Sequence, residues 1–524
     1  MNADLSKKKS TIYEIKSTHT TKIIIFVPYC DVYKPYIIDC LTSIENQKYS
    51  NYHIILVNDG SKDMNFLIHF INWKPFYTIL STTECLGPAH SKWTFINYLQ
   101  QNRHHFNMND IVLIVDGDDT LLRSDAFYII NQTYAITKCW CTFGEAVGKF
   151  CDNSLKNVSN INFDNVRKST WAFNHPRSMK LHILLNLKEQ EFKCDSEWLQ
   201  KGTDRPIVYG MLEMSGENRS QHIPISLYNY REHELNSYKT VENAILNKHK
   251  LHVVNANSHE CIVEDIHIVM CCWKRLFNLE QQIKMLNEQT CAQQICFHLI
   301  NNNPNTASEL NEMVERFRNL YTNIRIFLRH YDNKYFGFQR FFYIRDVIYK
   351  MYIAEYVIII DDDQIFDCNW VQTMYASAKP KTYSGWYMKK WCFDMNYWTG
   401  SIINMSHCKS KQQGQITTAD YIATCGCIID IRAFSDDSKL WNIPSDLPEG
   451  ISVYNIEDLW LSFILSKYYN WNLQRSFHLP ITDLNSMNPK SEQVSLFLSL
   501  RTEKQKLFEY LVYKRGWLEP LLEF

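Results

Sequence analysis

Short runs of apolar residues, each ending at a polar or acidic turn, recur along the first part of the chain. The runs Lys22–Pro28, His53–Val57 and Asp110–Val115 are continuously hydrophobic rather than alternating. This pattern is typical of parallel strands that are buried on both faces. Helical spacing of apolar residues in Tyr36–Gln47 and Ala89–Gln101 places helices between the strands. The pattern therefore predicts an α/β fold with an open, mainly parallel sheet, whose ligands collect at the carboxyl ends of the strands.

The same order of elements returns in the second half, as a repeat of architecture and not of sequence. Apolar runs predict four further strands, at 266–270, 295–300, 324–328 and 356–360. Segments with helical spacing predict the helices between them, at 279–289, 307–320 and 337–351. We therefore expect two α/β domains in tandem. Their expected bounds are a polar leader at 1–20, a first domain at 21–240, a linker at 241–262 and a second domain at 263–524.

Length and composition agree with two folded domains. A chain of 524 residues is too long for one ordinary core, since a domain usually holds about 100–200 residues. A formal net charge of -1 gives no broad attraction to nucleic acid, so we expect none as a partner. The chain shows no signal peptide and no apolar run of the about 20 residues needed to cross a bilayer. We expect a cytoplasmic, soluble protein without a transmembrane segment.

Aspartate clusters directly follow one apolar run in each half. They are Asp116-Gly-Asp118-Asp119 and Asp361-Asp362-Asp363. A strand end fixes the backbone, and the loop after it lets the carboxylates converge. Such hard oxygen ligands suit Mg²⁺ or Mn²⁺, which neutralises a departing diphosphate. Simple turns are the alternative interpretation, because Asp-Gly and Asp-Asp are common there. Two clusters at equivalent points favour the metal.

Four segments of the first domain resemble the family 2 glycosyltransferases of the GT-A fold. They are Val27-Pro28, Val57–Asp63, Gly87–His90 and Val115–Leu122. In that family, residues that match Pro28, Asp31 and Asp59 hold the nucleoside of the donor. Residues that match Asp116 and Asp118 contact the diphosphate and the metal, and we assign the metal to Asp118. The resemblance covers roughly residues 20–240 and implies a GT-A domain there.

The resemblance also implies an acidic base in the first domain. Its best match is Asp204, in Gly202-Thr-Asp-Arg-Pro206, and Glu213 is the competing candidate. A structural role for either carboxylate stays open. The segment Trp171–Arg177 resembles a substrate-facing loop of these enzymes, and the start of a helix is its alternative interpretation.

The second half resembles GT-A enzymes more distantly. The matching segments are Trp273–Arg275, Asn301–Asn303, Gly337–Arg340 and Asp361–Asp363. The resemblance implies a donor-nucleotide site made by Trp273, Arg275, Asn302, Arg340 and Asp361, with Asp363 on the metal. Glu457 and Asp458 match the acidic pair near the acceptor, and we expect Asp458 to be the base and Glu457 to orient it. The alternative is a helix start whose carboxylates complement the helix dipole. His478 falls where some of these enzymes carry a metal-binding histidine, and a structural role is its alternative.

Aromatic residues crowd one stretch of the second domain, where they either form an acceptor wall or pack in the core. They are Trp386, Trp391, Trp398, Tyr383, Tyr387 and Tyr397.

These features predict a metal-dependent, inverting glycosyltransferase. It moves a hexosyl group from a nucleotide diphosphate sugar, usually a UDP-sugar by the resemblance, to a hydroxyl of a glycan or protein-linked acceptor. Mn²⁺ or Mg²⁺ is the expected cofactor. Two complete acidic motifs favour a bifunctional enzyme, and a single active domain with the other as an acceptor scaffold is the alternative. A sugar nucleotidyltransferase usually has an early glycine-rich phosphate loop, which neither first strand provides. A non-enzymatic carbohydrate-binding protein is the third alternative.

Overall fold

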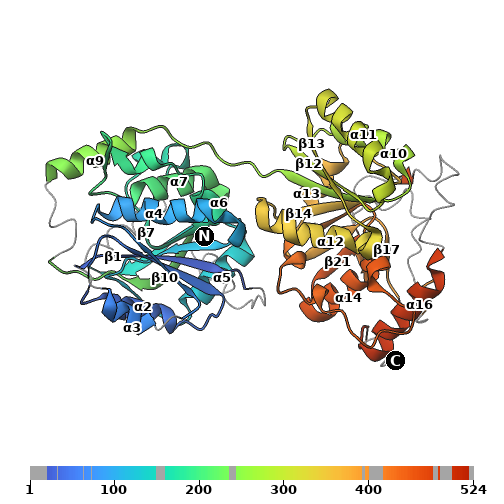
Figure 1. Cartoon of the computed structure of the whole chain (residues 1–524), viewed down its shortest axis with the longest axis horizontal. Coiled ribbons are helices and arrows are strands. Elements are labelled where there is room, and N and C mark those ends of the chain that lie inside the picture. The colour runs from blue at the N-terminus through green and yellow to red at the C-terminus, as the bar shows by residue number, and fades with distance from the viewer. Residues whose placement is uncertain are drawn as a thin grey trace, which may run out of the picture. The chain divides into compact units, whose positions relative to one another are not determined.

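The chain divides into two compact units, Met1–Ile262 and Val263–Phe524 (Figure 1). The computed structural model describes residues 20–31, 34–62, 64–71, 74–148, 158, 160–234, 243–391, 396–399, 417–475, 482–483 and 499–518. Each unit is built on a mixed sheet of eight described strands with helices against it. The predicted α/β fold class, with two sheet-bearing domains, is confirmed.

The sheet of the first unit begins with four parallel strands and continues with strands of mixed direction. Its order is β3 (Tyr77–Ser81), β2 (Tyr52–Asn58), β1 (Ile23–Tyr29), β4 (Ile111–Ile114), β7 (Asn174–Lys180), β6 (Cys141–Val147), β10 (Ser220–Asn229) and β5 (Thr120–Leu121). Strand β7 runs antiparallel to both β4 and β6, and β10 runs parallel to β6. Every residue of β1 is buried, as its continuous apolar run predicts.

Helices cover both faces of this sheet. They are α2 (Ile37–Glu45), α3 (Asn65–Ile71), α4 (Pro88–Gln101), α5 (Ala126–Thr137), α6 (Leu181–Leu184), α7 (Arg205–Ser215) and α9 (Asn243–Asn255). Helices α2 and α3 lie on one face, and α4 and α7 lie on the other (Figure 1). Helix α9, within the segment expected as a linker, packs on the first unit: the Arg167 guanidinium donates to the Val253 carbonyl at 2.8 Å, and the Gln200 N–H donates to His249 Nδ1 at 3.2 Å.

The sheet of the second unit repeats the order and directions of the first. Its strands are β13 (Ile324–His330), β12 (Ile295–Asn301), β11 (Ile266–Cys272), β14 (Tyr356–Ile360), β20 (Cys427–Asp430), β16 (Thr382–Gly385), β21 (Asn472–Arg475) and β18 (Thr417–Thr418). Strand β20 is antiparallel to β14 and β16, and β21 is parallel to β16. In this repeat β20 corresponds to β7 and β21 to β10, so the two acidic motifs follow equivalent strands, β4 and β14.

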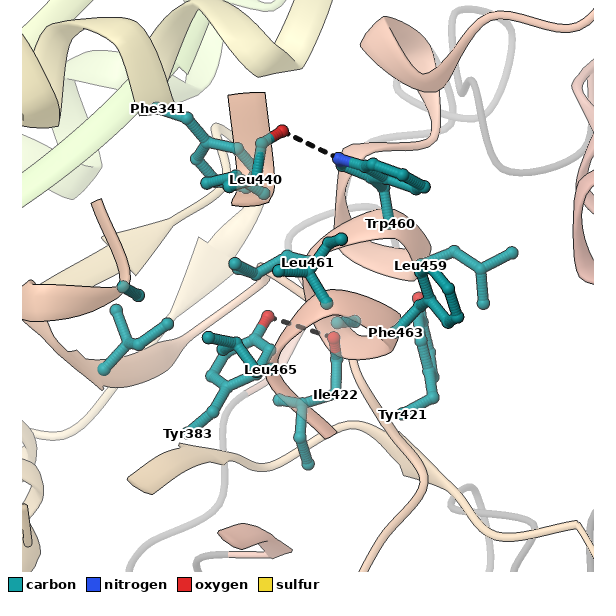
Figure 2. Packing of buried hydrophobic residues seen from close by; sticks show 14 of the residues in the cluster. Phe341, Tyr383, Tyr421, Ile422, Leu440, Leu459, Trp460, Leu461, Phe463 and Leu465 are labelled. Atoms are coloured by element: carbon teal, nitrogen blue, oxygen red, sulfur yellow. Dashed lines mark hydrogen bonds between the residues drawn. The ribbon is translucent and has the colours of Figure 1, made fainter. Parts of the chain in front are cut away.

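The helices of the second unit hold the acidic pair in place. They are α10 (Leu276–Asn287), α11 (Ala307–Leu320), α12 (Gln339–Tyr343), α13 (Trp370–Ser377), α14 (Glu457–Tyr469) and α16 (Arg501–Glu509). Figure 2 shows Leu461 and Leu465 of α14 packed among buried side chains. The Trp460 indole donates to the Leu440 carbonyl at 2.9 Å, and the Tyr383 hydroxyl donates to the Ile422 carbonyl at 3.0 Å. The bond of Trp460 ties the first turn of α14, which carries Glu457, to the segment at Leu440.

The segment expected as one helix over 337–351 is helical but changes type along its length. A 3₁₀ segment, Asn333–Phe338, leads into α12, and a wider π-helical segment, Ile344–Tyr349, follows it. Phe336 has φ 45° and ψ -133°, outside the helical region. Such a backbone is strained for a residue with a side chain, and Phe336 lines the same cavity as the second acidic motif.

Candidate active site

The loop after β4 packs directly on the end of β1. The Asp119 N–H donates to the Asp116 carbonyl at 3.0 Å and closes a turn. A Cβ at Gly117 would lie 2.3 Å from the carbonyl oxygen of Pro28, so only glycine allows this approach. The turn predicted as the alternative is therefore present, and it brings the aspartates against the predicted nucleoside residue Pro28.

Two histidines lie beside the carboxylates of the first motif. His233 Nε2 lies 2.9 Å from the Asp118 carboxylate, and both side chains are buried. His175 Nε2 lies 3.7 Å from the Asp116 carboxylate. Burial raises the pKa of Asp116 to about 7. His233 was not predicted: it stands in Arg231-Glu-His-Glu234 just after β10. Its position after the last long strand, corresponding to that of His478 after β21, was the available signal.

The next aspartate of the motif is a structural group. Asp119 accepts a hydrogen bond from the Arg231 N–H at 2.8 Å, which ties the loop to the segment carrying His233. Burial, reinforced by Asp118 and Asp116, raises the pKa of Asp119 to about 9. This carboxyl therefore stays protonated at neutral pH unless a cation joins the cluster.

The candidate base Asp204 lies just before α7 and is held by two cations. Arg177 Nη1 lies 2.6 Å from its carboxylate, and Lys92 Nζ lies 3.1 Å from it. Burial favours a higher pKa, but Lys92 and Arg177 outweigh it and hold the pKa of Asp204 well below its usual range. Arg177 lies in β7, so Trp171–Arg177 leads into a strand and the helix start weighed for it is wrong.

Glu213, the competing candidate, is bound inside the first unit. Its carboxylate accepts from the Arg167 guanidinium at 2.6 and 2.8 Å and from the His259 N–H at 3.0 Å. The two Arg167 bonds join α7 to the 3₁₀ segment Phe163–Lys168, and the His259 bond joins it to the segment that follows α9. Their geometry favours a structural role for Glu213.

The predicted nucleoside residues lie at the ends of β1 and β2. The Asp59 carboxylate, 5% exposed, accepts from the N–H groups of Leu86 and Gly87 at 3.1 and 2.8 Å. It therefore fixes the turn that leads into α4. Asp31 is exposed just beyond β1. The roles of Pro28, Asp31 and Asp59 toward a nucleoside stay predictions.

In the second unit the predicted residues line one cavity of about 470 Å³. They are Trp273, Arg275, Asn302, Arg340, Asp361, Asp363, Glu457 and Asp458. The cavity thus joins segments that are far apart in sequence at the carboxyl ends of β11, β12 and β14. His478 lies outside the described residues.

Two arginines neutralise the second motif. Arg340 bridges Asp361 and Glu457, at 2.9 Å from each carboxylate. Arg275 contacts Asp362 at 3.1 Å and also contacts Asp363. Burial raises the pKa of Glu457 to about 7, and Arg340 acts against this rise.

Both carboxylates of the predicted acceptor pair are fixed. A Cβ at Gly337 would lie 2.2 Å from Glu457 Oε1, so glycine makes room for this carboxylate. The Tyr421 hydroxyl donates to Asp458. The aromatic group is divided: Trp386 and Tyr387 line the cavity, whereas Trp391, Tyr383 and Tyr397 are buried in the core.

The described part of the chain contains no ready-made metal centre of three or more His, Cys, Asp or Glu side chains. Within that part, no helix is long and apolar enough to cross a membrane. The chemistry of the first cluster fits a divalent cation better than that of the second, because Asp118 faces an imidazole and Asp363 faces a guanidinium.

Residues 24–126 match the model of glycosyl transferase family 2. TarS of S. aureus, residues 1–349, has 14% identity and a TM-score of 0.30, over 40% of this chain and 60% of that one. Its complex with UDP-GlcNAc has 15% identity and a TM-score of 0.35, over 46% and 68%. The mannosyltransferase PcManGT from Pyrobaculum calidifontis, with GDP-Man and Mn²⁺, has 16% identity and a TM-score of 0.29, over 44% and 64%. No curated protein matches the chain.

Proposed function

We propose that residues 24–126 form a glycosyl transferase family 2 domain. On this premise, the protein transfers a hexosyl group from a nucleotide diphosphate sugar to an acceptor hydroxyl. The acceptor class that we propose is a glycan or a protein-linked glycan. The observation that carries the proposal is that Asp116 and Asp118, which follow β4, lie close enough to Asp204 at the start of α7 for its charge to act on Asp116. The second unit repeats the topology with its own acidic cavity, which supports a bifunctional enzyme.

In the first domain Asp118, His233 and Asp116 are the residues that would hold Mn²⁺ or Mg²⁺. Carboxylate oxygens suit these ions, and burial, reinforced by the charge of Asp204, raises the pKa of Asp116, so a cation would favour its ionised form. When bound, the metal would neutralise negative charge on the departing diphosphate. A UDP-sugar is the donor that we propose, because the family 2 resemblance favours it.

The chain's own carboxylates would handle the proton. In a single inverting displacement, the acceptor oxygen attacks the anomeric carbon as its proton passes to a carboxylate, and the nucleoside diphosphate leaves. We assign the carboxylate to Asp204 in the first domain and to Asp458 in the second. Lys92 and Arg177 keep Asp204 ionised, as a proton acceptor must be. Arg340 positions Glu457 beside Asp458.

The test is a panel of UDP-, GDP- and dTDP-sugars with Mn²⁺, in which release of nucleoside diphosphate by the full chain is followed with and without glycan acceptors. We expect release from at least one sugar, and a loss of at least 100-fold in the first domain's reaction on Asp118→Asn. Asp458→Asn should keep donor binding and remove the second domain's transfer.

Asp125→Asn is the matched control, because Asp125 is an exposed aspartate of the first domain, paired with Arg123. It should leave both reactions unchanged. If Asp118→Asn removes all release and Asp458→Asn changes none of it, only the first domain is active. Release that neither variant changes would contradict the site assignment.

A further inference from the structure

The two acidic motifs stand at equivalent points of the same topology but contact different partners. Each unit holds cationic side chains in direct contact with carboxylates of its site. In the first unit both cations, Lys92 and Arg177, contact Asp204. Asp116 and Asp118 instead have the imidazoles of His175 and His233 beside them, at 3.7 and 2.9 Å. In the second unit the cations contact the motif itself.

Arg275 is the closest of these cations to the motif. It follows β11 and stands at the start of α10, and its guanidinium contacts both Asp362 and Asp363. Its side chain is 13% exposed, and those of the two aspartates are 12% and 16% exposed. The ion pairs are therefore largely shielded from water. Electrostatic attraction is strong in such a shielded site.

Helix α10 is tied to the acidic loop by further bonds. The Asn278 amide donates to the Asp362 carbonyl at 3.0 Å, and the Gln282 amide donates to the Asp361 carbonyl at 2.8 Å. Arg275 thus lies on an element that is fixed to the loop it neutralises. Because a guanidinium does not lose its proton in proteins, its charge is permanent.

A divalent ion that is to bind Asp363 must displace or approach this guanidinium. Like charges repel strongly in a shielded site, so the contact disfavours a metal there. The same guanidinium fork is suited to the oxygens of a diphosphate. The donor set of the second cavity therefore fits a metal poorly but fits an anion well.

We propose that Arg275 is the resident cation of the second site and takes the place that a divalent metal takes in the first, so that each chain holds one functional metal. This inference replaces the assignment of Asp363 to a metal, and it rests on the proposed function only in naming a diphosphate as the anion. The two sites then differ in their metal requirement although they share a topology.

The test counts Mn²⁺ bound to the metal-free full chain, by electron paramagnetic resonance of free Mn²⁺ and by titration calorimetry. We expect one site per chain, lost in Asp118→Asn and kept in Asp363→Asn. Arg275→Gln should gain a second site, at least 100-fold tighter than any binding there in the wild type. Adding Asp363→Asn to Arg275→Gln should remove that second site.

Two variants control for charge and folding. Lys274→Gln makes the same charge change one residue away, and Arg275→Lys keeps the charge, so both should keep one site. Two sites in the wild-type chain, one of them lost in Asp363→Asn, would overturn the inference. An unchanged count in a folded Arg275→Gln chain would also overturn it. Because the count needs no turnover, failure of the sugar panel would contradict the proposed function and leave this result interpretable.

Discussion

At the scale of single residues, the two base candidates of the first domain differ in what they contact. Asp204 and Glu213 are both paired with arginine, but only Asp204 shares its surroundings with the first acidic motif. Loss of either carboxylate leaves a buried guanidinium short of a partner, so we expect Asp204→Asn and Glu213→Gln each to cost about 1–3 kcal/mol of stability. Only Asp204→Asn should abolish transfer by the first domain. Thermal unfolding and acceptor-dependent release measure the two effects, and equal activity losses would contradict the assignment.

The absence of a side chain at Gly337 leaves room for the carboxylate of Glu457. Alanine there would place a Cβ against Glu457 Oε1 and push this carboxylate off Arg340. We expect Gly337→Ala to lower the second domain's transfer at least tenfold while the first domain's rate is unchanged. Gly450→Ala is the comparison, because Gly450 has φ +77° and nothing within 4 Å of the added Cβ. It carries backbone strain without the clash and should keep both rates; an equal loss in both variants would argue against the steric cause.

The aspartates of both motifs could be predicted from the sequence, but the side chains that contact them could not. Asp118 and Asp361 could be found because each follows a continuous apolar run. Their partners His233 and Arg275 reach them from other elements, so the sequence next to the aspartates does not indicate either pairing. The contact between Arg275 and Asp363 was missed for this reason, and Arg275 was assigned to the donor nucleotide alone.

At the scale of elements, a buried histidine pair joins the parallel strands of the second unit. His267 Nδ1 and His298 Nε2 lie 2.9 Å apart, and His298 Nδ1 lies 2.9 Å from the Tyr343 hydroxyl. Burial lowers the pKa of His267 to about 3 and lowers that of His298 well below its usual value. Below about pH 6.5 these two histidines bind protons in the unfolded chain but stay neutral in the folded chain. This pair therefore lowers stability as the pH falls from about 6.5 toward 3.

We expect each histidine to contribute a slope of about 1.4 kcal/mol per pH unit in that range. Replacing the group with His267→Leu, His298→Leu and Tyr343→Phe should flatten the pH dependence of the second unit's unfolding. Chemical unfolding at a series of pH values measures it. His330→Gln, an exposed histidine on β13, should keep the wild-type slope. An unchanged slope in the triple variant would show that the pair titrates normally.

Most of the parallel strands were predictable, and the antiparallel strand β7 was not, for a physical reason. Strands β1, β2, β11 and β14 are buried apolar runs, which mark themselves in the sequence. Strand β7 reads Asn-His-Pro-Arg-Ser-Met-Lys and is nonetheless almost wholly buried. Its buried His175 and Arg177 contact the carboxylates of Asp116 and Asp204 instead of an apolar core, so its composition resembles that of a loop.

At the scale of the whole chain, each unit has its own hydrophobic core. The clusters around β1 and α5 belong to the first unit, and those around β11 and α14 belong to the second. We expect separate chains of residues 1–262 and 263–524 to fold, each with a cooperative transition followed by circular dichroism. A chain of residues 1–240 lacks α9 and its bond to Arg167, and should melt at a lower temperature than 1–262. Equal melting temperatures would show that α9 does not contribute to the stability of the first unit.

The guanidinium of Arg275 changes how the second site obtains its positive charge. A cation encoded in the chain is delivered with every copy that is made, whereas a bound metal must be taken from the surroundings. When manganese is scarce, the first site would lack its metal ion and its reaction would stop. The second site would keep the Arg275 guanidinium and its reaction would continue. The chain's output would then change in kind as well as in amount, and the ratio of the two products would report the metal status of the cell.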